Sequence, residues 1–233
     1  WVQRHMNPTG EIVEDLGVSH TPMAEYRAIL VKYNLSETFP PEVEAEAAGL
    51  PDSVSARDIS GRFDARSIPT ITIDPEDAKD FDDALSLRTL ENGNREIGIH
   101  IADVSRYVRQ NTPLDREAAK RGNSTYLVGT VIPMLPFKLS NGICSLVEDR
   151  DRLVKSVFIE YDSSANIVST RFANSVIRSS KRLSYDQAHA LLTLDSLEEA
   201  AAIKPPENYE TAFSGKALSE MSKGELSALR DMV

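Results

Sequence analysis

Four aspartates, Asp74, Asp80, Asp82 and Asp83, lie within ten residues of this chain. The segment from 74 to 83 reads Asp-Pro-Glu-Asp-Ala-Lys-Asp-Phe-Asp-Asp and holds six carboxylates against one lysine. Like charges a few ångströms apart repel and raise each other's pKa values. The segment must therefore extend into water, meet arginines or hold divalent cations.

A solvated loop is the ordinary fate of an acidic run, but the residues around this run argue against it. The strand-like segment Thr70-Ile71-Thr72-Ile73 precedes the run, another from Ala84 to Leu90 follows it, and Phe81 interrupts it. The backbone should therefore be anchored at both ends and in the middle. Carboxylates that are held in place are hard oxygen ligands, which suit Mg²⁺ or Mn²⁺.

A calcium loop of the EF-hand type is the rival metal site. With Asp80 at its first position, Leu85 occupies the sixth position, where the turn needs glycine, and the flanking segments read as strands instead of helices. The sequence therefore excludes an EF-hand.

The elements around the acidic run alternate between helices and strands. Proline at the first helical position and Ser-x-x-Glu/Gln capping boxes predict five helices, over residues 22–34, 41–48, 113–122, 185–192 and 223–233. Alternating apolar residues predict strands over 10–16, 70–73, 84–90, 96–104, 153–161 and 167–177. The sequence thus favours a mixed α+β fold with a mainly antiparallel sheet and flanking helices.

The remaining segments are predicted as connections. Asn92-Gly93 is typical of a type I′ hairpin turn, and residues 132–136 form an extended apolar connector. Residues 50–69 lack periodicity, and residues 203–214, with Pro205-Pro206, are expected to be a surface loop.

Bulk composition excludes several classes of protein. No apolar run approaches the roughly 20 residues that a membrane span needs, so no membrane partner is expected. The single cysteine, Cys144, excludes an internal disulfide framework and suits a cytoplasmic location. The net charge of −10 argues against nucleic-acid binding, but an acidic metal site lowers the total and basic residues can gather on one face.

Several ordered motifs together carry a family resemblance. The segment from Thr72 to Leu85 resembles the signature of the RNB catalytic domain of the ribonuclease II and ribonuclease R family. Further matches follow in chain order, at Gly98–Ser105, Ile132–Pro136, Leu139–Leu146 and Arg182–Asp186. Residues 10–14 resemble the end of the cold-shock domain that precedes the nuclease domain in ribonuclease R.

The resemblance implies that the chain is made of three parts. Residues 1–17 would end a cold-shock (OB-fold) RNA-binding domain, residues 18–69 would form a helical connector, and residues 70–233 would be the N-terminal portion of the RNB domain. The family's catalytic arginine and S1-type domain lie further downstream. If the resemblance holds, the chain is a fragment of a nuclease, and we expect it to be catalytically inactive alone.

The family's activity would be processive hydrolysis of single-stranded RNA from its 3′ end by a monomer, releasing nucleoside 5′-monophosphates. Two Mg²⁺ ions can stabilise both the attacking and the leaving oxygen of a phosphodiester, and they need several shared carboxylates. By resemblance Asp74, Asp80 and Asp83 would hold the metals, while Asp82 and Asp80 would act in catalysis. The competing class is a catalytically inactive RNB-fold RNA-binding protein, which would be expected to lose at least one of the four aspartates.

Other residues have both a structural and a functional interpretation. By resemblance Tyr126 and Tyr185 would stack on RNA bases, although each ring could instead pack in the core. His100 is expected to be a core residue, and Asp103 a support for the site. Basic residues in the second half are candidate phosphate contacts, although each one alone is more typical of an ordinary surface charge: Arg150, Arg152, Lys155, Arg171, Arg178, Lys181 and Arg182.

Overall fold

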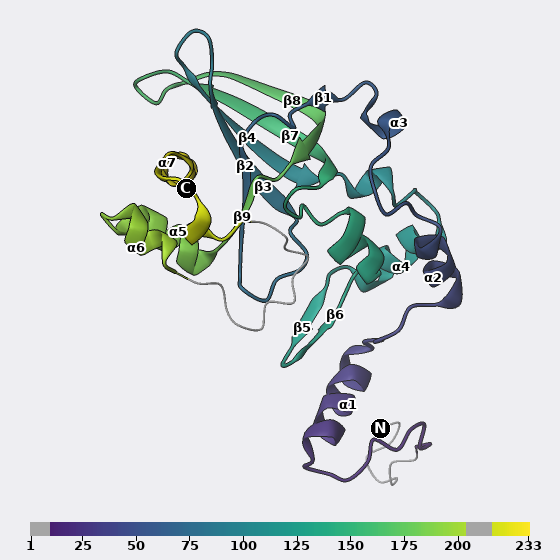
Figure 1. Ribbon diagram of the computed structural model, residues 1–233. Coiled ribbons are helices and arrows are strands. Elements are labelled where there is room, and N and C mark those ends of the chain that lie inside the picture. The colour runs from purple at the N-terminus through teal and green to yellow at the C-terminus, as the bar shows by residue number, and fades with distance from the viewer. Residues whose placement is uncertain (1–9, 204–215) are drawn as a thin grey trace.

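A seven-stranded sheet organises the computed structural model, which describes residues 10–203 and 216–233 (Figure 1). The strand order is β1-β8-β7-β4-β3-β2-β9. Its strands are β1 (Phe63–Asp64), β2 (Thr70–Asp74), β3 (Asp83–Thr89), β4 (Arg95–Ala102), β7 (Asp151–Tyr161), β8 (Ile167–Arg178) and β9 (Lys181–Ser184). A separate two-stranded hairpin joins β5 (Thr125–Leu127) and β6 (Thr130–Ile132).

The centre of the sheet is antiparallel and its two edges are parallel. The hairpins β3–β4 and β7–β8 and the neighbouring pair β4–β7 are antiparallel. At the edges, β1 runs parallel to β8 and β2 runs parallel to β9. The predicted mixed α+β class with a mainly antiparallel sheet is therefore confirmed.

The turn between β3 and β4 differs from the predicted type. A type I′ turn needs positive φ at both central residues, but of Asn92 and Gly93 only Gly93 has one, at 84°. The Gly93 N–H donates to the Leu90 carbonyl at 2.9 Å, and the Leu90 N–H donates to the Asn94 carbonyl at 2.8 Å. The hairpin is correct, but its loop is longer than two residues and places only the glycine in the left-handed region.

Local signals located the helices well. The structure contains α1 (Pro22–Tyr33), α2 (Pro41–Ala48), α4 (Pro113–Arg121), α5 (Tyr185–Thr193) and α7 (Lys223–Met232), together with the short α3 (Ala56–Ile59) and α6 (Leu197–Ala201). Capping boxes at Ser184 and Ser222 begin α5 and α7 as predicted. Shorter turns are η1 (Val104–Arg106), the π-helical η2 (Lys138–Ile143) and η3 (Leu218–Glu220).

Two apolar cores lie against the sheet. One core gathers Val43 of α2, Leu114 of α4 and Leu139 of η2 with Phe158 and Val154 of β7. The other gathers residues of α5, α6 and α7 against Ile71 and Leu183, which belong to the parallel pair β2–β9. Figure 1 shows α5, α6 and α7 on the side of the sheet away from α2 and α4.

Part of one sheet face carries exposed apolar side chains. Ile99 and Ile101 of β4 and Phe172 of β8 are exposed, and the strand register places Ile99 beside Val157, which itself faces Phe172. Among the described residues, the apolar cluster of the α5–α7 layer includes Ile71, Ile73, Leu85 and Leu183 of the sheet but not Ile99, Ile101 or Phe172.

Some predicted segments are corrected. Residues 10–16 form no strand, and residues 50–69 contain α3 and β1 where no element was expected. Ile132, the first residue of the predicted connector 132–136, is instead the last residue of β6 and pairs with Thr125 of β5. The predicted loop 203–214 lies almost wholly outside the described residues. Among residues 10–203 and 216–233, no helix has the length and apolarity of a membrane span.

Candidate active site

The acidic segment is a loop between two paired strands. Asp74 is the last residue of β2 and Asp83 is the first residue of β3, so the strands fix both ends of the loop. Phe81 is buried between them, as its apolar ring predicted. The predicted anchoring at both ends and in the middle is therefore present.

A serine from the segment after η2 holds the middle of the loop. The Phe81 N–H donates to Ser145 Oγ at 3.1 Å, and that hydroxyl donates to the Lys79 carbonyl at 2.9 Å. The next residue, Leu146, donates its N–H to the Phe81 carbonyl at 2.8 Å. The backbone that carries Asp80 and Asp82 is therefore fixed by hydrogen bonds from outside the loop.

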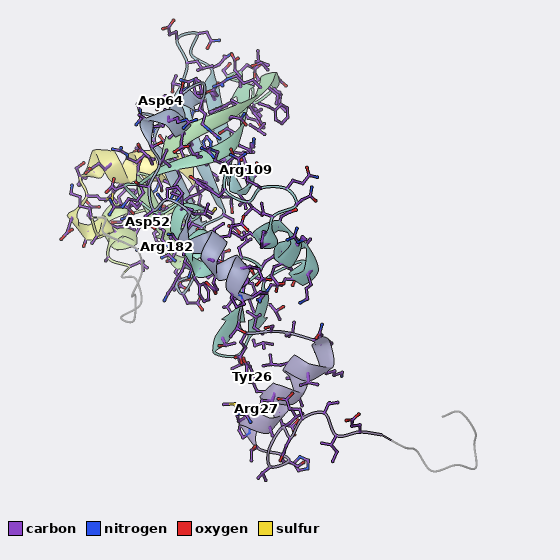
Figure 2. All side chains as sticks on the ribbon, turned by 90° about the vertical axis from the view of Figure 1, so that its right-hand side faces the viewer. Tyr26, Arg27, Asp52, Asp64, Arg109 and Arg182 are labelled. Atoms are coloured by element: carbon purple, nitrogen blue, oxygen red, sulfur yellow. The ribbon has the colours of Figure 1, made fainter. Side chains whose placement is uncertain are left out.

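Arg182 of β9 holds the first part of the loop. Its guanidinium donates to the carbonyls of Pro75 and Glu76, and it lies 5.4 Å from the centre of the Phe81 ring. The residue is only 2% exposed, and Figure 2 shows it within the body of the molecule, far from α1 with Tyr26 and Arg27. Arg182 is thus a buried support of the loop, and the prediction that it is a surface phosphate contact is wrong.

The aspartates repel one another electrostatically. Burial raises the pKa of Asp74 to about 6, with a further contribution from Asp83 and smaller ones from Asp80 and Asp82, while Arg182 acts in the opposite direction. The pKa of Asp82 is also raised, mainly because neighbouring atoms displace water from its carboxylate. Repulsion from Asp80 and Asp83 raises this pKa further. All four predicted aspartates therefore belong to one electrostatic cluster.

The cluster has the donor chemistry of a Mg²⁺ site. Asp74 Oδ2 is buried and accepts no hydrogen bond from the residues that the structure describes, so a strong acceptor of the cluster has no partner among them. A divalent cation would supply that partner and relieve the repulsion that raises the pKa values. In the part of the chain described by the structure, no three acidic, histidine or cysteine side chains already lie around a common point as a complete set of metal ligands.

Tyr126 lies directly against the acidic loop. It belongs to the β5–β6 hairpin, and its hydroxyl donates to Asp80 Oδ2 at 3.0 Å. Partial burial and this contact with Asp80 raise the pKa of the phenol. The residue is nevertheless 65% exposed, so it does not pack in the core and its ring is accessible to a ligand.

Tyr185 reaches the same end of the sheet from another direction. The parallel register of β2 and β9 places Ser184 opposite Asp74, and Tyr185 follows as the first residue of α5. Tyr185 is 56% exposed. Both tyrosines predicted to bind RNA are therefore surface residues close to the carboxylates in the fold.

A groove of about 1080 Å³ runs along the loop and the β5–β6 hairpin. Its lining includes three of the four aspartates and Tyr126, and also residues that the sequence did not assign to the site: Thr130, Val131, Phe137, Ser140 and Asn141. Ser140 and Asn141 belong to a motif that carried the resemblance, whereas Val131 and Phe137 were missed because they flank a segment predicted to be an apolar connector. An exposed phenylalanine beside it gives no signal in sequence.

Other candidates have structural roles. His100 is fully buried between the hydroxyls of Ser86 and Ser156, both at 2.8 Å, as expected of a core histidine. Asp103 is buried and its carboxylate pairs with Arg62 at 2.6 Å. Two further predicted phosphate contacts, Arg152 and Lys181, are buried and bind internal groups.

Comparison with known proteins gives a consistent result. The family described as "RNB domain" matches residues 62–230. Ribonuclease R of Thermotoga maritima is 47% identical over 206 residues, which cover 88% of this chain and 28% of that protein. The chain therefore spans less than a third of the length of this relative.

Solved structures share the fold. Ribonuclease R of Mycoplasma genitalium, in complex with ribose-methylated single-stranded RNA, has a TM-score of 0.71 and 31% identity, covering 82% of this chain and 29% of that one. Yeast Ssd1, described as a pseudonuclease, has a TM-score of 0.68 at 24% identity over 81% of this chain and 25% of its own. The second likeness concerns the fold alone.

Proposed function

Because this chain belongs to the RNB-domain family of ribonuclease R, we propose that it supplies the acidic half of the active centre of a Mg²⁺-dependent exoribonuclease. The enzyme hydrolyses single-stranded RNA processively from the 3′ end, acts as a monomer and releases nucleoside 5′-monophosphates. The observation that carries the proposal is the retention of Asp74, Asp80, Asp82 and Asp83 on one loop, where raised pKa values mark Asp74 and Asp82 as carboxylates in need of a cation.

The aspartates divide into two roles in this proposal. Asp74, Asp80 and Asp83 hold the metal, and Asp82 and Asp80 act on the reacting linkage. When bound, Mg²⁺ supplies the positive charge that stabilises developing negative charge on the phosphodiester oxygens. The protein's contribution is rigidity, because hydrogen bonds from Ser145 and Arg182 fix the loop backbone that presents these carboxylates.

Tyr126 and Tyr185 position the RNA strand. Stacking on an aromatic ring is worth about 1–3 kcal/mol per base and tolerates any base, which suits an enzyme that degrades RNA of any sequence. The hydrogen bond from Tyr126 to Asp80 links one of these platforms to the carboxylate cluster. A base stacked on Tyr126 would therefore direct its strand toward the aspartates.

The test is an assay of the longer protein that contains this chain, on 3′-tailed RNA with Mg²⁺ and with EDTA. We expect shortening from the 3′ end in Mg²⁺, none in EDTA, and a loss of several orders of magnitude in Asp82→Asn. Asp77→Asn is the matched control, because Asp77 is an exposed carboxylate of the same loop without an assigned role. Unchanged degradation by Asp82→Asn would contradict the site assignment.

The second candidate is an RNA-binding protein without nuclease activity, since a yeast pseudonuclease shares this fold. The same assay distinguishes the two functions. Retention of RNA by gel shift, with no shortening in Mg²⁺ or Mn²⁺, would support the binding protein and overturn the proposed hydrolysis.

A further inference from the structure

Phe137 is an exposed aromatic ring in the wall of the groove. It is 54% exposed, although its neighbours Pro136 and Leu139 are buried. It lines the same groove as Tyr126 and as the carboxylates Asp74, Asp80 and Asp82. The fold thus leaves two aromatic side chains open to solvent along one groove that contains the acidic loop.

The backbone around Phe137 is held firmly. The N–H of Leu139 donates to the Pro136 carbonyl at 2.8 Å, and Lys138 Nζ donates to the Ala48 carbonyl at 2.9 Å. Lys138 also pairs with Asp52 at 3.4 Å. An aromatic ring on a fixed backbone loses little conformational freedom when a flat ligand stacks on it.

We propose that Phe137 is a further stacking platform for a nucleobase of single-stranded RNA, in addition to the base held at Tyr126. This inference rests on the proposed function, because it assumes that the groove takes RNA. Tyr126 touches the acidic loop through Asp80, whereas Phe137 comes from the segment after β6. Because the Tyr126 hydroxyl bonds Asp80 directly, the proposal places the Phe137 base on a nucleotide further from the reacting linkage than the Tyr126 base.

The surroundings of Phe137 favour a nucleotide over a purely apolar ligand. Ser140 and Asn141 line the groove with polar side chains, and the Ser140 hydroxyl donates to Asn141 Oδ1 at 3.0 Å. Ribose and base edges offer both donors and acceptors to such groups. Phe172, by contrast, is 80% exposed on a sheet face with Ile99 and Ile101, and it is absent from the groove lining.

The experiment compares Phe137→Ala with Phe172→Ala, which makes the same substitution at an exposed phenylalanine outside the groove. Both are made in an Asp82→Asn background of the longer protein that contains this chain, so that RNA is retained in Mg²⁺. Fluorescence anisotropy measures the affinity for labelled oligoadenylates of increasing length. We expect Phe137→Ala to weaken binding of long oligoadenylates about 5- to 150-fold, the fold-change that corresponds to loss of one stacked base, and to leave the shortest bound oligoadenylates unaffected.

A second readout locates the base. 2-Aminopurine placed at successive positions of the oligonucleotide is quenched where it stacks, and Phe137→Ala should abolish quenching at a position further from the 3′ end than the one lost in Tyr126→Ala. Phe137→Trp should restore both affinity and quenching, and Phe172→Ala should change neither.

Equal affinities and unchanged quenching in Phe137→Ala would overturn this platform while leaving the proposed function intact. Failure of the Asp82→Asn parent to bind any oligoadenylate would overturn both. A loss of binding by Phe137→Ala at every length, together with a lowered melting temperature, would assign Phe137 to folding and also contradict the platform.

Discussion

Asp74 lies opposite Ser184 in the parallel pairing of β2 and β9, so an aspartate of the acidic loop and the N-cap of α5 meet at one end of the sheet. Ser184 accepts a hydrogen bond from the Gln187 N–H at 3.2 Å, and the Gln187 side chain accepts one from the Ser184 N–H at 3.0 Å. The same capping box therefore fixes the start of α5, where Tyr185 directly follows the residue that lies opposite Asp74.

Ser184→Ala should affect both stability and RNA binding. Loss of an N-cap costs about 1 kcal/mol in the free energy of unfolding, and a frayed first turn would displace Tyr185. Ser222→Ala is the control, because Ser222 forms an equivalent capping box on α7. Urea unfolding should show similar losses in both variants, while anisotropy should show weaker RNA binding only in Ser184→Ala. Equal RNA affinities would contradict the positioning role.

The stability of the metal-free chain should fall as pH rises from about 4 to about 6. The pKa of Asp74 is about 6 in the folded chain and about 4 when unfolded, so the folded state binds more protons across this range and loses stability on ionisation. Ion-paired carboxylates act in the opposite direction at lower pH, as Asp64 does with its pKa of about 2.

Asp74→Asn isolates this contribution. At neutral pH in EDTA, the free energy of unfolding of the variant should exceed that of the parent by about 1–2 kcal/mol. This is less than the free energy that corresponds to the full pKa shift, because solvent screens the site and the Asn side chain loses the attraction to Arg182. Thermal melts at several pH values provide the measurement. A parent and a variant with parallel pH profiles would contradict the raised pKa.

Magnesium should stabilise the chain through the same carboxylates. Binding to the folded state alone contributes about 2.7 kcal/mol when the ion is at 100 times its Kd, which would appear as a rise in melting temperature. Asp83→Asn should abolish the rise and Asp77→Asn should retain it. An equal rise in both variants would indicate nonspecific binding to the acidic surface.

Arg182→Ala should be strongly destabilising. Arg182 is buried and donates to the carbonyls of Pro75 and Glu76. Its removal withdraws these hydrogen bonds and empties a buried site, although the Pro75 carbonyl keeps a bond from the Ala78 N–H at 3.1 Å, and it should cost about 2–4 kcal/mol. Arg178→Ala removes a half-exposed arginine that pairs with Asp151 at 2.7 Å, and should cost under about 1 kcal/mol. Chemical denaturation distinguishes them, and Arg182→Lys serves if Arg182→Ala does not fold. Similar small losses in both variants would show that the loop does not depend on Arg182.

The parts of the fold that sequence predicted correctly are those set by local signals. Proline at the first helical position located α1, α2 and α4, and capping boxes located α5 and α7. The central strands followed from alternation of apolar residues. The parallel edges escaped prediction because β1 has only two residues and β9 four, and their partners lie more than a hundred residues away.

The sequence predicted the charged residues of the site but not the residues that hold the acidic loop in place. The aspartates are visible as a run, and Phe81 correctly indicated anchoring. Arg182 looked like one surface cation among several, because sequence does not show that β9 pairs with β2 and thereby buries its guanidinium beside the loop. Phe137 was hidden for the opposite reason, since exposure of an apolar residue depends on the tertiary fold.

The β2–β9 pairing also sets the order in which the site can form during synthesis. Thr70 and Ser180 are joined by hydrogen bonds across 110 residues of chain, and closing so long a loop delays the contact relative to the local hairpins. A ribosome-bound chain that has emerged only as far as β8 would have the acidic residues but not Arg182 or Tyr185. The acidic loop of the nascent protein would thus lack the contacts of β9 until that segment has left the ribosome. The aspartates would be synthesised well before the site that contains them is folded.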